Sequence, residues 1–183
     1  MTEGDRLARS WAYLARWRWY PVPATFLAFT IAFYIGATAQ LSAADASELV
    51  QLWGQVFSGV KSPIDIFLNN YQIALYFTIP IVGAPFAMYE SYFSGLVIAA
   101  MAQANKADPV MVVILTLANP VGVLEFMGYA LSITQGILIV YAVARKHLKK
   151  EIRNTAITLA LVLAILMLSA FIEFELVKGF LNP

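Results

Sequence analysis

The stretch "IDIFLNNYQIALYFTIPIVGAPFAMYESYFSGLVIAAMAQA", residues 64–104, decides how many times the chain is expected to cross a membrane. It is apolar for about forty residues, roughly twice the length that one helix needs to cross a bilayer. Three helix-breaking residues interrupt its middle: Pro80, Gly83 and Pro85. The stretch therefore predicts two membrane helices, 64–82 and 85–104, joined by a tight turn.

The composition indicates a membrane protein. Of 183 residues, 61% are hydrophobic and 13% are charged, whereas soluble domains are about half apolar and about a quarter charged. The absence of cysteine excludes disulfides and thiolate chemistry, and the only histidine, His147, cannot form a metal site by itself. We expect one membrane domain over residues 1–183, with no cofactor.

Three more apolar stretches predict membrane helices, and the first is read as a retained helix rather than a signal peptide. The predicted spans are 22–40, 120–144 and 154–177. The expected fold is therefore an all-α, polytopic transmembrane helical bundle of about five spans.

Three further segments are expected at the membrane boundary. Residues 1–21 mix arginines with aromatic residues, which is typical of an interfacial segment. Residues 47–60 predict an amphipathic helix on the membrane surface or against the bundle, with Asp45 and Ser47 as N-cap signals. Residues 110–118 are too short to cross and predict a half-helix or re-entrant segment.

Five spans place the N-terminus and the basic run after residue 144 on the same side of the membrane. That side holds nine of the twelve Lys and Arg residues. By the positive-inside rule, we expect a multi-pass protein of the cell membrane with a cytoplasmic N-terminus and an extracytoplasmic C-terminus. A single helix over 64–104 would put the basic run outside.

Small residues recur four positions apart in several spans, which lets helix backbones approach closely in lipid. This pattern predicts a tightly packed bundle or a homo-oligomer. The packing positions include Gly95, Gly128, Ser132 and Gly136. The remaining members of such stripes are Ala24, Ala28, Ala32, Gly36, Ser91, Ala99, Ala156, Ala160 and Ala164.

Polar side chains within the apolar stretches are the candidate functional site. No Lys or Arg lies in the spans to pair with the acids, so they are expected to be neutral, hydrogen-bonded or bound to a cation. The cluster is either a proton or cation site or a structural clasp that fixes helix register. Its members are expected at a similar depth or near the helix break: Asn69, Asn70, Asn119, Glu125 and Glu173.

Other chemistry has little support in the sequence. There is no phosphate-binding loop, no His-Glu metal spacing and no Ser-His-Asp set, so the chain is not expected to be an enzyme. The basic run is either an orientation signal or a site for anionic membrane lipids; no nucleic-acid binding is expected. This run contains Arg145, Lys146, Lys149, Lys150 and Arg153.

Four strings together resemble the stage II sporulation protein M family of integral membrane proteins, over roughly residues 64–183. "IFLNNYQIAL" resembles the Asn-bearing start of a membrane helix in that family, and "YESYFSGLVIAA" has Ser94-Gly95 where the family has Asn-Gly. "NPVGVLE", with Pro120, Gly122 and Glu125, resembles its Pro-His-Gly-x-x-Glu motif with Val121 replacing the histidine. "LSAFIEFELVKGF" resembles its closing helix and carries Glu173.

The resemblance implies a membrane scaffold that anchors or recruits partner proteins. In spore-forming bacteria, the family member is thought to anchor and position cell-wall hydrolases during engulfment of the forespore. Expected partners are membrane lipids, other copies of the chain, and membrane or envelope proteins. The alternative is a small oligomeric transporter or channel whose pathway the Asn and Glu side chains line. A scaffold predicts a dry, closed acid cluster that tolerates Glu125→Gln; a transporter predicts a water-accessible cavity and loss of flux in the same variant.

Overall fold

The structure is a computed structural model that describes residues 18–181, without the side chains of 56, 57, 177 and 179–181. Within residues 18–181 the fold is all-α, with seven helices and no strand. The helices are α2 Pro21–Ala37, α3 Ala43–Ser58, α4 Pro63–Phe77, α5 Gly83–Ala104, α6 Pro109–Ala118, α7 Pro120–Ala144 and α8 Leu148–Leu181.

Several helices begin where the sequence supplies a first-turn proline or a side-chain cap. The carboxylate of Asp108 accepts the backbone N–H of Val110 at 2.8 Å, and the amide oxygen of Asn119 accepts that of Val121 at 3.0 Å. Both satisfy an N–H that the first turn leaves without a helical partner. Proline lacks that N–H and fits the first turn, as at Pro21, Pro63, Pro109 and Pro120.

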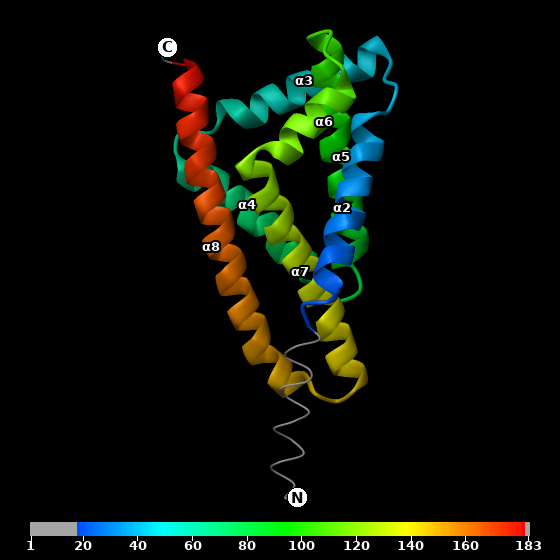
Figure 1. Cartoon of the computed structure of the whole chain (residues 1–183), viewed down its shortest axis with the longest axis vertical. Coiled ribbons are helices and arrows are strands. Elements are labelled where there is room, and N and C mark those ends of the chain that lie inside the picture. The colour runs from blue at the N-terminus through cyan, green and yellow to red at the C-terminus, as the bar shows by residue number, and fades with distance from the viewer. Residues whose placement is uncertain (1–17, 182–183) are drawn as a thin grey trace, which may run out of the picture.

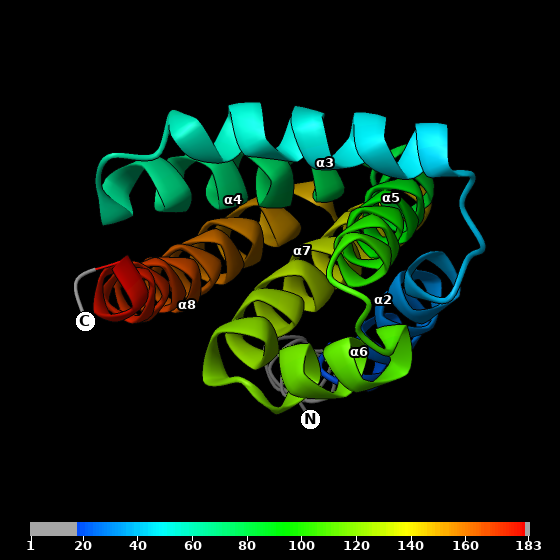
Figure 2. The same ribbon diagram turned by 90° about the horizontal axis from the view of Figure 1, so that it is seen from above.

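The longest helices lie along the molecule, and α7 lies between the others. In Figure 2, α8 and α4 lie on one side of α7, and α5 and α2 lie on the other. Figure 1 shows α3 crossing the long helices towards one end, near α6 and the end of α8, while the α7–α8 connection forms the opposite end. The central place of α7 explains why most side chains from Val121 to Gly136 are buried.

Aromatic side chains fill the space where α2, α4 and α7 meet. The ring of Phe29 on α2 lies 5.0 Å from that of Phe126 and 5.5 Å from that of Tyr129, both on α7. On α4, the ring of Phe77 lies 6.0 Å from that of Phe29 and 5.4 Å from that of Tyr129. Such tilted and edge-to-face contacts make a dense apolar core.

Helices α2 and α5 pack closely because small residues face each other along them. A Cβ atom on Gly36 would clash with the carbonyl oxygen of Tyr92, and one on Gly95 would clash with that of Phe33. One turn before Gly95 on α5, the hydroxyl of Ser91 donates to the carbonyl oxygen of Phe29 on α2 at 2.6 Å. Close backbone approach of this kind is typical of helix packing in membranes.

Among residues 18–181, two helices are long and apolar enough to cross a membrane: α7 and residues 148–176 of α8. Helices α2 and α4, also expected to span, have 17 and 15 residues. Only 28% of the apolar 18-residue segment of α8 is buried within the molecule. Large apolar side chains are exposed along α8: Ile157, Leu161, Leu163, Leu168 and Phe171. An apolar face of this length is typical of contact with lipid rather than water.

Some helix boundaries differ from the sequence-based expectation. Helix α4 ends at Phe77 rather than residue 82, because residues 78–82 form a turn in which Ile81 has φ 71°. Helix α8 begins at Leu148, before the apolar run at 154, because the intervening Lys, Glu and Arg residues also favour helix. The interfacial segment expected at 1–21 lies outside the described residues up to position 17.

The amphipathic helix also starts earlier than expected. It runs over α3, 43–58, rather than 47–60. The hydroxyl of Ser42, not Ser47, receives the backbone N–H of Asp45 at 3.2 Å and donates to the Asp45 carboxylate at 2.7 Å. These two hydrogen bonds cap the N-terminus of α3, which begins four residues before the expected position.

Candidate functional site: two polar clusters on one helix

The first cluster joins Glu125 on α7 to α4. The Nδ2 of Asn70 donates to Oε1 of Glu125 at 2.7 Å. The Nδ2 of Asn69 in turn donates to Oδ1 of Asn70 at 3.2 Å. Asn69 is exposed and Asn70 is partly buried, so the two amides form a chain from the surface of α4 to the carboxyl of Glu125.

Glu173 on α8 belongs to the same region. Its carboxyl is close enough to that of Glu125 for the two to interact electrostatically. One turn earlier on α8, the buried hydroxyl of Ser169 donates to the carbonyl oxygen of Val121 at 3.2 Å. Residues from α4, α7 and α8 therefore meet here, while the side chain of Asn119 caps its own helix.

The Pro-x-Gly-x-x-Glu string forms the corner between α6 and α7. Pro120 is the first residue of α7. A Cβ atom on Gly122 would clash with the carbonyl oxygen of Thr116, so glycine lets α6 fold back tightly against the start of α7. The proline and glycine shape the backbone, and Glu125 follows within the first two turns of the helix.

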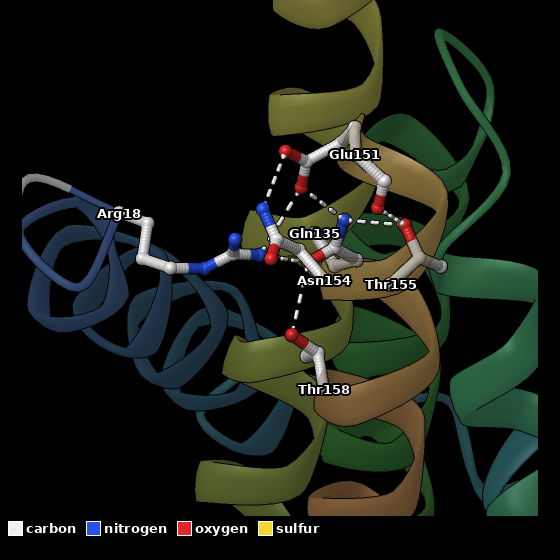
Figure 3. Close-up of polar contacts among 6 residues, drawn as sticks. All are labelled: Arg18, Gln135, Glu151, Asn154, Thr155 and Thr158. Carbon is white, nitrogen blue, oxygen red and sulfur yellow. Dashed lines mark hydrogen bonds and ion pairs between the residues drawn. The ribbon is translucent and has the colours of Figure 1, made fainter. Parts of the chain in front are cut away.

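The second cluster surrounds Gln135, which the sequence analysis did not single out (Figure 3). Its Oε1 accepts from Nη2 of Arg18 at 2.7 Å and from the hydroxyl of Thr158 at 3.0 Å. Its Nε2 donates to Oε1 of Glu151 at 2.8 Å and to the hydroxyl oxygen of Thr155 at 2.8 Å. With 1% of the residue exposed, Gln135 uses both amide hydrogens and both acceptor positions of its oxygen.

An ion pair completes this second cluster. Nη2 of Arg18, just before α2, lies 3.1 Å from Oε1 of Glu151, and their side chains are only 12% and 14% exposed. The Nδ2 of Asn154 donates to the other Glu151 oxygen at 3.3 Å. The cluster thus ties the start of α2 to α7 and α8. Two signals mark it in the sequence: a lone amide in the long apolar helix, and the only acid between Glu125 and Glu173.

The predicted packing residues all lie at helix contacts. A Cβ atom on Gly95 would clash with α2, one on Gly128 would lie 2.9 Å from Cδ2 of Leu166, and one on Gly136 would lie 2.9 Å from the carbonyl oxygen of Phe77. Ser132 is fully buried, and its hydroxyl has no hydrogen-bond partner among the described residues.

The predicted basic cluster lies at the α7–α8 connection. All five side chains are exposed: Arg145, Lys146, Lys149, Lys150 and Arg153. The guanidinium of Arg145 lies 5.4 Å from the ring centroid of Tyr141, which is a cation–π distance.

The chemistry of the two clusters is that of hydrogen bonds and paired charges. Among residues 18–181, no group of three or more His, Cys, Asp or Glu side chains is placed to hold a metal ion. Comparison of the chain with protein-family models, curated proteins and solved structures finds no match.

Proposed function

We propose that this protein is a non-enzymatic integral membrane scaffold that anchors or recruits partner proteins, as its resemblance to stage II sporulation protein M implies. The observation that carries this proposal is the filled interior. Aromatic rings occupy the junction of α2, α4 and α7, including Phe29, Phe77 and Tyr129. The carboxyl of Glu125 accepts a hydrogen bond from Asn70, which itself accepts one from Asn69.

Five helices are proposed to cross the membrane: α2, α4, α5, α7 and α8. Helix α4 is short for a span and is inclined to its neighbours, and its last residue packs against Gly136 of α7. Exposed apolar side chains along α8 support contact with lipid. With the basic α7–α8 connection in the cytoplasm, the N-terminus is cytoplasmic and the C-terminus extracytoplasmic.

Partner proteins are proposed to dock at the end formed by α3 and α6. Helix α6 exposes Met111, Ile114 and Leu115 by 54%, 53% and 61%. Helix α3 lies across the same end and exposes Leu52 by 47%. These short helices add exposed apolar surface where the long helices end, which suits a binding surface at the membrane boundary.

Site-specific photo-crosslinking in the native membrane tests this surface. A photoreactive residue at Met111 or Leu115 is expected to give a discrete crosslinked protein. The matched controls are Ile157 and Leu161 on α8, exposed by 60% and 40%, which should give no product with a different protein. Crosslinks to a different protein from α8 alone, or none from α6, would contradict the proposed docking end.

A homo-oligomer is proposed to form through α8. Its small-residue stripe, Ala156, Ala160 and Ala164, is exposed, whereas Gly128, Ser132 and Gly136 on α7 are buried within the molecule. Because the native chain has no cysteine, Ala160→Cys gives a clean test. Oxidation is expected to yield a disulfide-linked dimer with Ala160→Cys and little with Leu161→Cys. Equal yields from both would argue against this face.

One observation favours the second candidate function, a small transporter. The carboxyls of Glu125 and Glu173 approach each other from two helices, as a proton- or cation-handling pair would. Proton- and cation-driven flux into proteoliposomes separates the two functions. The scaffold predicts flux no greater than in empty liposomes. Flux that Glu125→Gln abolishes while the protein stays folded would establish transport instead.

A further inference from the structure

The end of the α7–α8 hairpin, residues 137–153, projects beyond the neighbouring helices. Gly136 still packs against the end of α4, and Gln135 still contacts the start of α2. From 137 to 153, Ala142 is the only buried residue, whereas nearly all residues from 126 to 136 are buried. Figure 1 shows this end of the hairpin extending past the starts of α2 and α5.

The outward charge of this hairpin end is positive. It carries five exposed cations and a single acid, Glu151. The Glu151 carboxylate is turned inward, 3.1 Å from Arg18 and 2.8 Å from the amide of Gln135, and its side chain is 14% exposed. The second cluster therefore turns away from the surface the one negative charge of residues 137–153, which would otherwise weaken the attraction of an anion.

Exposed apolar side chains lie between these cations. The aromatic ring of Tyr141 beside Arg145 is typical of the depth of lipid headgroups. The exposed apolar residues are Ile137, Val140, Tyr141, Val143, Leu148 and Ile152. Cations next to apolar side chains match a ligand with an anionic head and a hydrocarbon tail, and a nucleic acid would leave these side chains without a partner.

We propose that the hairpin end binds the phosphate headgroups of anionic phospholipids in the surrounding leaflet, with their acyl chains against its apolar side chains. This proposal rests on the membrane embedding argued above. A basic run that only orients the chain in the membrane need not select among lipids. The proposal instead predicts selective binding of anionic over zwitterionic lipids of the same chain length at the hairpin end.

Lipid binding to the purified full-length chain in neutral detergent tests the proposal. Dioleoyl phosphatidylglycerol and dioleoyl phosphatidylcholine are titrated separately, and bound lipid is counted by native mass spectrometry. The key variant replaces Lys146, Lys149 and Arg153 with Gln. The matched control replaces Lys61, Lys106 and Lys178 with Gln. Lys146 and Lys106 are comparable because both follow a helix with positive φ, 59° and 54°.

The native chain and the control variant are expected to bind phosphatidylglycerol at least about tenfold more tightly than phosphatidylcholine. The hairpin variant should lose most of that preference while eluting as the same folded species. A preference retained by the hairpin variant, or equal binding of both lipids to the native chain, would overturn the proposal. Resistance of each variant to alkaline extraction from membranes tests embedding separately.

Discussion

The two polar clusters on α7 differ in how their charges are compensated. Glu125 and Gln135 are ten positions apart, about 15 Å along the helix. At the first, two carboxyls interact and an amide chain reaches one of them, with no cation partner among the described residues. At the second, a neutral amide lies between a cation and an anion and uses its full hydrogen-bonding capacity.

The difference shows that the residue most conspicuous in the sequence is not the one with the most partners. An acid in an apolar run attracts attention because an isolated charge in lipid is costly. Gln135 is uncharged, yet it joins the start of α2 to three positions on α8. We therefore expect the second cluster to contribute more to stability, and the first to tolerate more change.

Glu151→Ala should give the largest loss. It removes the carboxylate that compensates the charge of Arg18, and it takes one acceptor away from both that guanidinium and the amide of Gln135 in a partly buried site. Hydrogen bonds to charged groups contribute about 1.5–3 kcal/mol to stability, so the free energy of unfolding should fall by an amount in this range. The free energy of unfolding in mixed micelles, measured by titration with SDS, checks it.

The same helix offers a control for this prediction. Glu175 lies 3.2 Å from Lys178, but their side chains are 70% and 51% exposed. An exposed pair contributes about 0–1 kcal/mol, so Glu175→Ala should be close to neutral. Equal losses in Glu151→Ala and Glu175→Ala would remove the distinction between the buried network and a surface pair.

Glu125→Ala should give an intermediate loss. It removes the acceptor of the 2.7 Å bond from Asn70, and a single hydrogen bond contributes about 1 kcal/mol. Glu125→Gln keeps an acceptor oxygen of similar reach and should be nearly neutral in the same unfolding assay. A loss in Glu125→Gln as large as in Glu151→Ala would show that the charge or proton of Glu125, rather than its shape, is required.

Much of the helical layout was predictable because it depends on local chemistry. Breakers at Pro80, Gly83 and Pro85 predicted two helices within residues 64–104, and α4 and α5 are separate helices there. The same reasoning placed the end of α4 five residues late and the start of α5 two residues late, because it could not tell that Thr78 to Val82 would form the turn. Apolar length alone also did not predict that α2 and α4 would have 17 and 15 residues.

The second cluster was not predictable in the same way because its members come from separated segments. Arg18 and Gln135 are 117 positions apart, and Arg18 and Glu151 are 133 apart. In the sequence, Arg18 counts as one of several N-terminal arginines and Glu151 as one residue in a basic run. Only the antiparallel packing of α7 and α8, with α2 starting beside them, brings the three together.

The smallest change, Ser132→Ala, probes α7 between the two clusters. Ser132 is fully buried, and its hydroxyl has no hydrogen-bond partner among the described residues, unlike Gln135 one turn later. A buried polar group without a partner costs free energy, so removing this hydroxyl should leave stability unchanged or raise it by up to about 1 kcal/mol. The same SDS titration measures this. A clear loss of stability would mean that the hydroxyl is bonded in the membrane, and that polar contacts extend along α7 between Glu125 and Gln135.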